Sequence, residues 1–379
     1  MRLSGWWCAA FLAAAVPGCK KKSNEAADQS AAKTTTPGQT GSAIAPGTEG
    51  MATGSAAPGE TAKPATPQDM AKRYVECWGF WSAKDWKSFA SCYAPDATSD
   101  FVDSGMPPAT GSQQILERDK VFTDAFPDIK GDVQLTLING KQGATFALVT
   151  GTHTAPLKMP MGEVPPTNKK IGMQVAHTVH FAEDGKTVDK EWVYQDLGEM
   201  MGQLGVAKGP VRPAADKPRH DNEIVIAKDD DTEKKNLGVA QQMMDAFNKR
   251  DMKALEAVLD DKIVWSEQGV AKDWTSKAEA IKAHQRLLKA FSDLKLTSDN
   301  AWAAGDYVVV QGAMTGTNDG PAPDMGLAKA TRKPVELKFM QLFQIKDGKI
   351  TRSDGYWNSA AMAQQLGLTG ALSRKPAKP

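Results

Sequence analysis

The chain has few cysteines, no excess of either charge and no long hydrophobic run. Four Cys among 379 residues are too few for a disulfide scaffold or for several zinc sites. Lys plus Arg number 46 and Asp plus Glu 45, without the basic excess that nucleic-acid binding requires. No apolar stretch reaches the roughly 20 residues that span a bilayer. At roughly 150 residues per domain, the sequence predicts a soluble protein of about two domains that binds no nucleic acid.

The sequence also lacks the common catalytic and cofactor motifs. It contains no G-x-S-x-G, H-E-x-x-H, C-x-x-C, P-loop or G-x-G-x-x-G pattern. Serine hydrolases, zinc proteases, thioredoxin-like proteins and nucleotide or dinucleotide enzymes therefore have no support. We expect a protein without a metal and without a cofactor.

The first nineteen residues read as an export signal. A basic start, Met1-Arg2, precedes an apolar stretch from Trp6 to Val16, which is too short for a membrane span. Val16-Pro17-Gly18-Cys19 then resembles the bacterial lipobox, in which a Cys becomes lipidated. We expect a lipoprotein signal peptide at residues 1–19 and lipidation of Cys19. An ordinary signal peptide is the alternative.

Residues 20–68 have the composition of a tether. Of these 49 residues, 34 are Ala, Gly, Pro, Ser or Thr, and none is aromatic. Such a segment buries too little apolar surface to offset its ordering entropy, so we expect disorder. Lys20 follows Cys19 in place of the Asp that favours inner-membrane retention. The sequence thus predicts a lipid-anchored envelope protein, held at the outer membrane and facing the periplasm or the cell surface.

The remaining chain contains one pattern twice. Five landmarks recur in the same order, and their offset drifts only from 166 to 162 residues. They are Asp85 and Asp251, residues 125–128 and 290–293, residues 151–153 and 316–318, residues 183–186 and 346–349, and residues 203–206 and 365–368. We expect two homologous domains at 69–206 and 232–370, a linker at 207–231 and a tail at 371–379.

Each copy begins with helices and continues with strands. Ala71, Tyr74, Val75, Trp78 and Trp81 form one helical stripe, and capping boxes at Thr110 and Ser276 predict a later helix in each copy. The second short helix of each copy is expected to carry Tyr93 or Leu259. Alternating strands with turns at Asn139-Gly140, Asp184-Gly185 and Asp347-Gly348 follow. This order predicts an α+β fold.

The landmarks resemble the SnoaL-like polyketide cyclase and ester cyclase family of the nuclear transport factor 2-like superfamily. The similarity rests on Asp85-Trp86, Tyr93-Ala94-Pro95-Asp96, Ala125-Phe126-Pro127-Asp128, Gly151-Thr152-His153, Asp184-Gly185-Lys186, and Trp192 through Asp196 to Gln203-Leu204-Gly205. It covers nearly all of the first copy, and the second copy follows more weakly. The resemblance implies cone-shaped domains, each with a curved antiparallel sheet around helices and an apolar pocket. Family members are commonly dimers through the sheet, so the two copies are expected to form a pseudo-dimer within one chain.

The resemblance also implies a site in the first copy. Trp192, Tyr194 and Asp196 share a strand face, and burial beside aromatic rings would raise the pKa of Asp196. Asp196 lies where the cyclases carry their acid/base Asp, which makes His153 and His177 candidate polarising groups. Trp192, Tyr194 and Trp78 are candidate ligand contacts. As an alternative, Asp196 caps the helix that begins near Leu197.

Other pairings of polar residues are less promising. His177 and His180 point to opposite strand faces, which argues against a metal site built from both. In the second copy Asn318, Met340, Phe343 and Asn358 are aligned with His153, His177, His180 and Asp196, so we expect a degenerate, catalytically silent domain. Asp354 as a displaced carboxylate is the less favoured alternative. Cys77 and Cys92 are either a disulfide or two buried thiols.

Two functions from different classes remain. The favoured one is an envelope lipoprotein whose two domains bind a small hydrophobic molecule or a partner. The alternative is a cofactor-free acid/base enzyme, such as a cyclase, isomerase or hydrolase, acting on a small hydrophobic carbonyl compound through Asp196. The fold itself does not decide between them.

Overall fold

The computed structural model describes residues 65–160, 162–207, 211–220 and 222–368. The expected signal peptide, Cys19, most of the expected tether and the tail lie outside these residues. Within the described ranges, no helix is long and apolar enough to cross a membrane. We refer to residues 65–226 as domain 1 and to residues 231–368 as domain 2.

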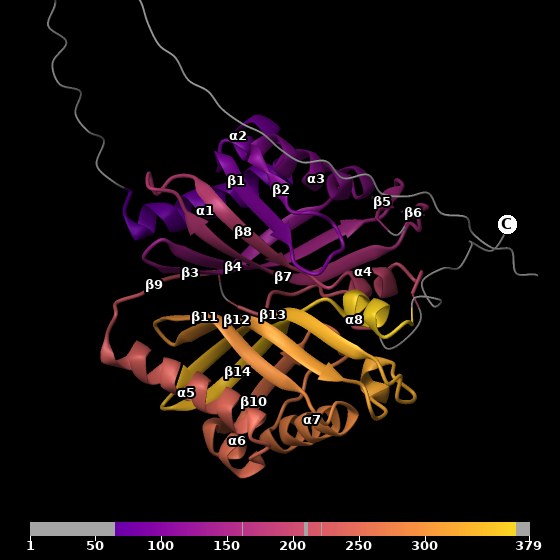
Figure 1. Ribbon diagram of the computed structural model, residues 1–379. Helices are drawn as coiled ribbons and strands as arrows, with labels where there is room; N and C mark the ends of the chain where they lie inside the picture. Colours follow the sequence, from indigo (N-terminus) through magenta and orange to yellow (C-terminus); the bar gives the residue numbers. More distant parts are fainter. Residues whose placement is uncertain (1–64, 161, 208–210, 221, 369–379) are drawn as a thin grey trace, which may run out of the picture. The chain divides into compact units, whose positions relative to one another are not determined.

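Domain 1 places three helices against a curved sheet (Figure 1). The helices are α1 (Pro67–Ala83), α2 (Trp86–Ala90) and α3 (Gly111–Ala125), and a short helix, α4 (Leu197–Gln203), follows the last strand of the repeat. The sheet has the order β2-β1-β8-β7-β4-β3-β9, and β5 pairs with β6 outside it. The strands are β1 (Tyr93–Phe101), β2 (Ala109–Thr110), β3 (Lys130–Asn139), β4 (Gln142–Thr152), β5 (Leu157–Met159), β6 (Gly162–Val164), β7 (Lys170–Phe181), β8 (Val188–Tyr194) and β9 (Glu223–Ile226).

Domain 2 repeats this arrangement. Its helices are α5 (Asp231–Asn248), α6 (Met252–Val258), α7 (Lys277–Ala290) and α8 (Ser359–Gln365), with a 3₁₀ turn, η1, at Pro323–Met325. The sheet has the order β10-β14-β13-β12-β11. Its strands are β10 (Leu259–Glu267), β11 (Lys295–Ala304), β12 (Tyr307–Thr317), β13 (Pro334–Lys346) and β14 (Lys349–Tyr356).

The expected α+β class and the order of helices and strands are confirmed. The sheets are not wholly antiparallel, however, because β1 runs parallel to β8 and β10 runs parallel to β14. Tyr93 and Leu259 open these strands instead of closing the second helix, which corrects the sequence prediction. A short apolar run after a helix fits either element, and pairing with a distant strand decides the matter.

Helix starts also differ in detail from the prediction. Thr110 precedes α3, but its side chain makes no capping hydrogen bond. Ser276 does accept from the Glu279 backbone N–H, whereas Glu279 turns to the backbone N–H of Thr275, so only half of the capping box forms. A complete capping box appears instead at Thr66, ahead of α1. The last residues of the expected tether therefore belong to domain 1.

The expected linker at 207–231 is partly built into the fold. Its residues Glu223–Ile226 form β9, which pairs in parallel with β3 at the edge of the domain 1 sheet. Arg212 donates to Asp273 and to the Glu267 carbonyl of domain 2, and Arg219 donates to Asp354. Proline in this segment excludes helix but leaves these side-chain contacts possible.

Each sheet is covered on both faces. The inner faces pack on the helices in two separate clusters, one per domain. The outer faces meet in a third cluster, which we call the interdomain cluster. Its buried members are Val102, Leu135, Leu137, Ala144, Phe146, Ala176, Tyr194, Trp302, Ala304, Tyr307, Val309, Met340, Leu342 and Tyr356.

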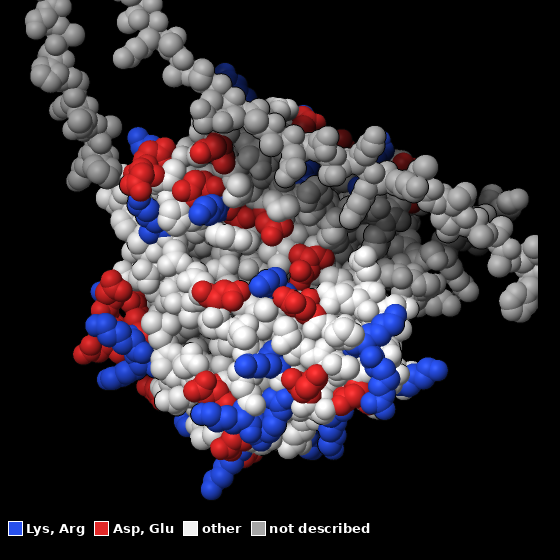
Figure 2. All heavy atoms as spheres, in the orientation of Figure 1, with Lys and Arg blue, Asp and Glu red and all other residues white. Residues whose placement is uncertain are grey.

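Polar groups complete the contact between the outer faces. Gln311 donates to the Thr178 and Tyr194 hydroxyls at 2.8 and 3.0 Å. Asn300 donates to Gln142 at 2.7 Å. Each polar group buried at such a contact needs a partner, because an unmet hydrogen bond costs about 1–3 kcal/mol. Acidic and basic side chains are intermixed on the face drawn in Figure 2, and neither sign forms a patch there.

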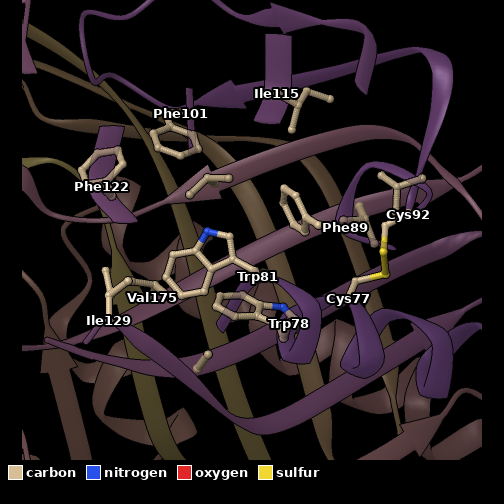
Figure 3. Packing of buried hydrophobic residues seen from close by; sticks show 14 of the residues in the cluster. Cys77, Trp78, Trp81, Phe89, Cys92, Phe101, Ile115, Phe122, Ile129 and Val175 are labelled. Atoms are coloured by element: carbon tan, nitrogen blue, oxygen red, sulfur yellow. A yellow bond between two sulfur atoms is a disulfide. The ribbon is translucent and has the colours of Figure 1, made fainter. Parts of the chain in front are cut away.

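Cys77 and Cys92 form a disulfide, which settles the alternative left open by the sequence. The bond ties α1 to the residue just before β1, and it lies in the domain 1 core beside Phe89 (Figure 3). The bridge spans 15 residues along the chain, including α2.

Reduction should therefore destabilise domain 1. A cross-link that closes a loop of this length limits the unfolded chain and contributes about 3 kcal/mol. We expect thermal unfolding followed by circular dichroism to begin several degrees lower in dithiothreitol, and the Cys77→Ser, Cys92→Ser double variant to melt low with or without reductant. Identical melting of the oxidised and reduced wild type would contradict this expectation.

Candidate functional site

Domain 1 encloses a cavity of about 60 Å³ between α1, α3 and the inner face of the sheet. Trp78 and Trp81 form much of its wall, with ring centres 5.9 Å apart (Figure 3). A Cβ atom at Gly131 would lie 2.5 Å from the Trp78 ring, so only glycine leaves room for this indole on β3. Aromatic rings therefore fill most of the cone and leave space for a small group only.

A buried carboxylate, Glu191, collects most of the polar groups at this cavity. It lies on β8 with only 3% of its surface exposed. Its oxygens accept hydrogen bonds from the hydroxyls of Tyr74 at 2.7 Å, Tyr93 at 3.2 Å and Ser99 at 2.5 Å. His177 Nδ1 lies 3.1 Å from Glu191 Oε1. Burial raises the pKa of Tyr74 and Tyr93 well above the usual value, so both are neutral donors.

These partners keep Glu191 ionised. Burial alone would raise its pKa, but the hydrogen bond and charge of His177, the Ser99 hydroxyl and the Arg118 charge lower the pKa to about 2. An ionised Glu191 accepts the Nδ1–H of His177, which leaves Nε2 as the ring nitrogen available to a ligand. Glu191 thus orients His177 as a carboxylate orients the histidine of a catalytic dyad.

A second carboxyl group, Asp119 on α3, also lines the cavity. Its side chain is 15% exposed and lies 3.5 Å from Arg118. Burial raises the pKa of Asp119 to about 6, against the lowering effect of Arg118. Arg118 is itself held by Ser99 and lies over the Phe101 ring at 3.7 Å. Asp119 can therefore take up or release a proton near neutral pH.

Trp81 contributes an unused donor. Its indole N–H is buried and has no hydrogen-bond partner among the residues that the structure describes. Because Trp81 lines the cavity, an acceptor atom of a bound molecule would satisfy this N–H. The cavity thus combines an acid/base carboxyl, an oriented histidine and a free donor.

Asp196 does not belong to this constellation, which corrects the sequence prediction. Its carboxylate accepts from the Gly198 backbone N–H and so caps α4. The same oxygen accepts from the backbone N–H and hydroxyl of Ser359 in domain 2, at 2.9 and 2.7 Å. Burial does raise the pKa of Asp196, but the burial comes from α4 and α8 rather than from a ligand pocket.

The expected ligand contacts also divide between two places. Trp78 and His177 line the cavity. Trp192 and Tyr194 share a strand face as expected, but it is the outer face, which packs in the interdomain cluster. His153 is fully buried, with Nδ1 3.1 Å from the Thr167 hydroxyl and its ring against Phe126. His180 pairs with Asp189 and lies apart from His177.

The strand register changes the alignment of the two copies. Ala176 pairs with Tyr194, and Met340 pairs with Tyr356, so Met340 corresponds to Ala176. The counterpart of His177 is therefore Gln341 rather than Met340, and that of His180 is Gln344 rather than Phe343. By the same register Ser353 replaces Glu191, and Gln341 donates to Ser353 Oγ at 2.6 Å. The Glu191–His177 pair of domain 1 is therefore absent from the corresponding positions of domain 2.

Asp354 occupies the position of Trp192 and faces the interdomain contact. It is fully buried and paired with Arg352 at 2.7 Å and Arg219 at 3.1 Å. Although burial opposes it, His220, whose Nε2 lies 3.6 Å from the carboxylate, and the two arginines hold the pKa of Asp354 well below its usual range. Asp354 is thus a structural anion rather than a replacement for Asp196.

Domain 2 contains a larger cavity than domain 1. It measures about 310 Å³ and is lined mainly by aromatic, aliphatic and Met side chains from α5, α7 and the inner face of the sheet. Three tryptophans take part, namely Trp265, Trp274 and Trp357. Glu267 and His284 are polar groups in its wall.

Each of the two domains matches a known family model. Residues 68–204 match the family model described as SnoaL-like polyketide cyclase, and residues 240–353 match the model described as SnoaL-like domain. The chain contains two SnoaL-like domains. Among proteins with curated descriptions, none matches the chain.

Similar solved structures cover one SnoaL-like domain each. A candidate SnoaL-like polyketide cyclase from Jannaschia is 19% identical with a TM-score of 0.34, covering 38% of this chain and 97% of its own. A candidate polyketide cyclase from Xanthomonas campestris is 24% identical with a TM-score of 0.32, covering 36% and 98%. A candidate polyketide cyclase, IdmH, from Streptomyces antibioticus is 20% identical with a TM-score of 0.31, covering 35% and 98%.

Sequence reasoning identified His177 but missed the two carboxyl groups of the domain 1 cavity. Successive side chains of a strand point to opposite faces, so Glu191 shares a face with Val193 and not with Trp192. Strand periodicity could therefore have placed Glu191 on the face opposite Trp192. Asp119 lies on α3 beside Arg118, and in the sequence the two residues resemble an ordinary pair of surface charges. The sequence carried no signal that these two carboxyls, 72 positions apart, face one cavity.

The pKa of Asp119 leads to a pH-dependent stability prediction. The folded pKa of about 6 exceeds the ordinary value of 3.8, so ionisation of Asp119 stabilises the unfolded chain. Asp119→Asn should match the wild type near pH 4 and be more stable near pH 8, by about 2–3 kcal/mol. Urea unfolding at both pH values measures this difference.

Asp124→Asn serves as the matched control, because Asp124 is exposed on the same helix. We expect this control to behave alike at both pH values. A stability difference between Asp119→Asn and wild type that is the same at pH 4 and pH 8 would contradict the prediction.

Proposed function

We propose that domain 2 binds a small apolar molecule inside its cone. The main support is the cavity of about 310 Å³, which falls at the lower end of the size range of small-ligand pockets. The cavity of domain 1 is about 60 Å³. Side-chain size accounts for the difference in volume between the two cavities, because Ala240 and Met244 occupy the positions of Tyr74 and Trp78 of domain 1.

The wall of the larger cavity suits variable apolar shapes. Met243, Met244, Met314 and Met325 line it, and Met side chains adapt easily to their contacts. Its tryptophans add flat contact surface. Such a wall favours burial of a hydrophobic molecule over recognition of a strongly polar one.

Filling the cavity should abolish this binding. Ala283 is buried on α7 and lines the cavity, so Ala283→Phe would occupy the space. The neutral dye N-phenyl-1-naphthylamine should fluoresce strongly with the wild-type chain and at least tenfold less with Ala283→Phe. Titration of dye into the purified full chain measures the difference.

Ala278→Phe provides the control, since Ala278 lies on the exposed side of the same helix. This variant should bind the dye as the wild type does. Undiminished binding by Ala283→Phe, or no binding by the wild type, would refute the proposed function.

We propose acid/base chemistry in domain 1 as a second function. Asp119 would remove a proton next to the carbonyl of a small hydrophobic substrate, with the Trp81 N–H on the carbonyl oxygen. The protonated Asp119 would return this proton to another atom of the substrate, which regenerates the site, and His177, oriented by Glu191, would accept a hydrogen bond from the substrate at Nε2. The raised pKa of Asp119 is the first requirement, so an unshifted Asp119 in the unfolding experiment would remove the base.

We further propose that the chain is an envelope lipoprotein and that its two domains form an intramolecular pseudo-dimer. The lipobox-like residues before Cys19 and the composition of residues 20–64 support the anchor, at the outer membrane facing the periplasm or the cell surface. The interdomain cluster and the bonds from Gln311 support the pseudo-dimer.

Lipidation can be tested directly. Metabolic labelling with a fatty-acid analogue should mark the wild-type chain, whereas Cys19→Ala should lose the label because the thiol is the acylation site. Equal labelling of both chains, or of neither, would refute the anchor.

A further inference from the structure

Glu267 sets the cavity of domain 2 apart from that of domain 1. It ends β10 and is the one Asp or Glu among the described residues that line this cavity. Strand register makes Phe101 its counterpart in domain 1, because Trp265 pairs with Ser353 as Ser99 pairs with Glu191. The cavity of domain 2 thus has the Glu267 carboxyl group at the position where domain 1 has the Phe101 ring.

The donors around Glu267 are directed at its carboxylate. The indole N–H of Trp265 donates to Oε1 at 2.6 Å, and that of Trp357 donates to Oε2 at 3.0 Å. A Cβ atom at Gly355 would lie 2.1 Å from Oε2, so this glycine makes room for the carboxylate. A carboxylate offers about four acceptor sites, so capacity remains for a ligand.

His284 presents an acceptor as well. Its Nδ1 lies 2.7 Å from the Ala280 carbonyl, an interaction that requires the proton on Nδ1. Burial lowers the pKa of His284 to about 4, so the ring is neutral at pH 7 and Nε2 is an acceptor. The Trp265 ring meets His284 edge to face at 4.5 Å between centres.

Among the described residues of this wall, positive side chains occur only at exposed positions. Arg286 and Lys289 line the cavity, but both are exposed residues of α7, at its rim. The buried polar groups named above are a carboxyl and a neutral imidazole. Burial raises the pKa of Glu267, and a cation beside it would favour the ionised form.

We propose that the domain 2 cavity binds a hydrophobic organic cation, an alkylammonium, with its nitrogen at Glu267 and its chain among the apolar side chains. The proposal rests on the proposed function of domain 2 as a binding module for small apolar molecules. Trp265, Trp274 and Trp357 line the cavity and suit this class, because an ammonium group is attracted to indole rings. The acceptors of Glu267 and His284 add to that attraction.

The test compares three ligands with the same six-carbon chain by isothermal titration calorimetry on the full chain. They are hexylammonium, hexan-1-ol and hexanoate. The cation should bind the wild type about tenfold more tightly than the alcohol, as expected for one cation–π and charge contact. Hexanoate should bind more weakly than the alcohol, because Glu267 repels it.

Glu267→Gln isolates the charge. Gln keeps an oxygen for one indole N–H, so the cation should lose about tenfold in affinity while hexan-1-ol is unchanged. Glu256→Gln removes one negative charge from an exposed position on α6 and should change neither affinity. The unchanged alcohol affinity shows that the cavity of the variant remains intact.

The outcomes separate this inference from the proposed function. If all three ligands bind the wild type equally, or hexanoate binds best, the cation inference is overturned while apolar binding stands. If none binds the wild type, both are overturned. Should Glu267→Gln fail to fold, the order of the three affinities on the wild type still decides.

Discussion

Burial of each sheet on both faces governs the structure of this chain. In most single antiparallel sheets one face meets the core and the other meets water. Here the inner faces pack on helices and the outer faces pack in the interdomain cluster. Residues from both faces of a strand are therefore excluded from water, and most buried polar groups find a partner within one domain or across the contact.

The polar groups divide according to these two faces. On the inner side, Glu191 draws in two tyrosines, a serine and His177, and these side chains occupy much of the first cone. On the outer side, Asp354 is paired with two arginines, and one oxygen of Asp196 accepts hydrogen bonds from a helix start in each domain. Carboxylates of similar burial thus have different roles, because one faces a cavity and the others face packed protein.

Divergence of the copies follows from the same inner face. Replacement of Tyr74 and Trp78 by smaller residues opens the second cone, in which Ser353 and Gln341 stand at the positions of Glu191 and His177. Glu267 and three tryptophans supply a different set of contacts there. The cavities of the two domains are therefore lined by different polar groups.

The sequence alone determined the repeat, the α+β class, the order of most elements and the turns, because each depends on local periodicity and backbone preference. Asp347 and Gly348, for example, both adopt positive φ in the two-residue hairpin that Asp-Gly predicts. Tertiary structure decided which strand face lines each cavity. Alternation along the strand showed that Trp192, Tyr194 and Asp196 point to the same side of the sheet. Because both faces of the sheet are apolar, it did not reveal whether that side faces the cavity of domain 1 or domain 2. Only the packing of the two sheets placed Asp196 between helices and brought Glu191, His177 and Asp119 together.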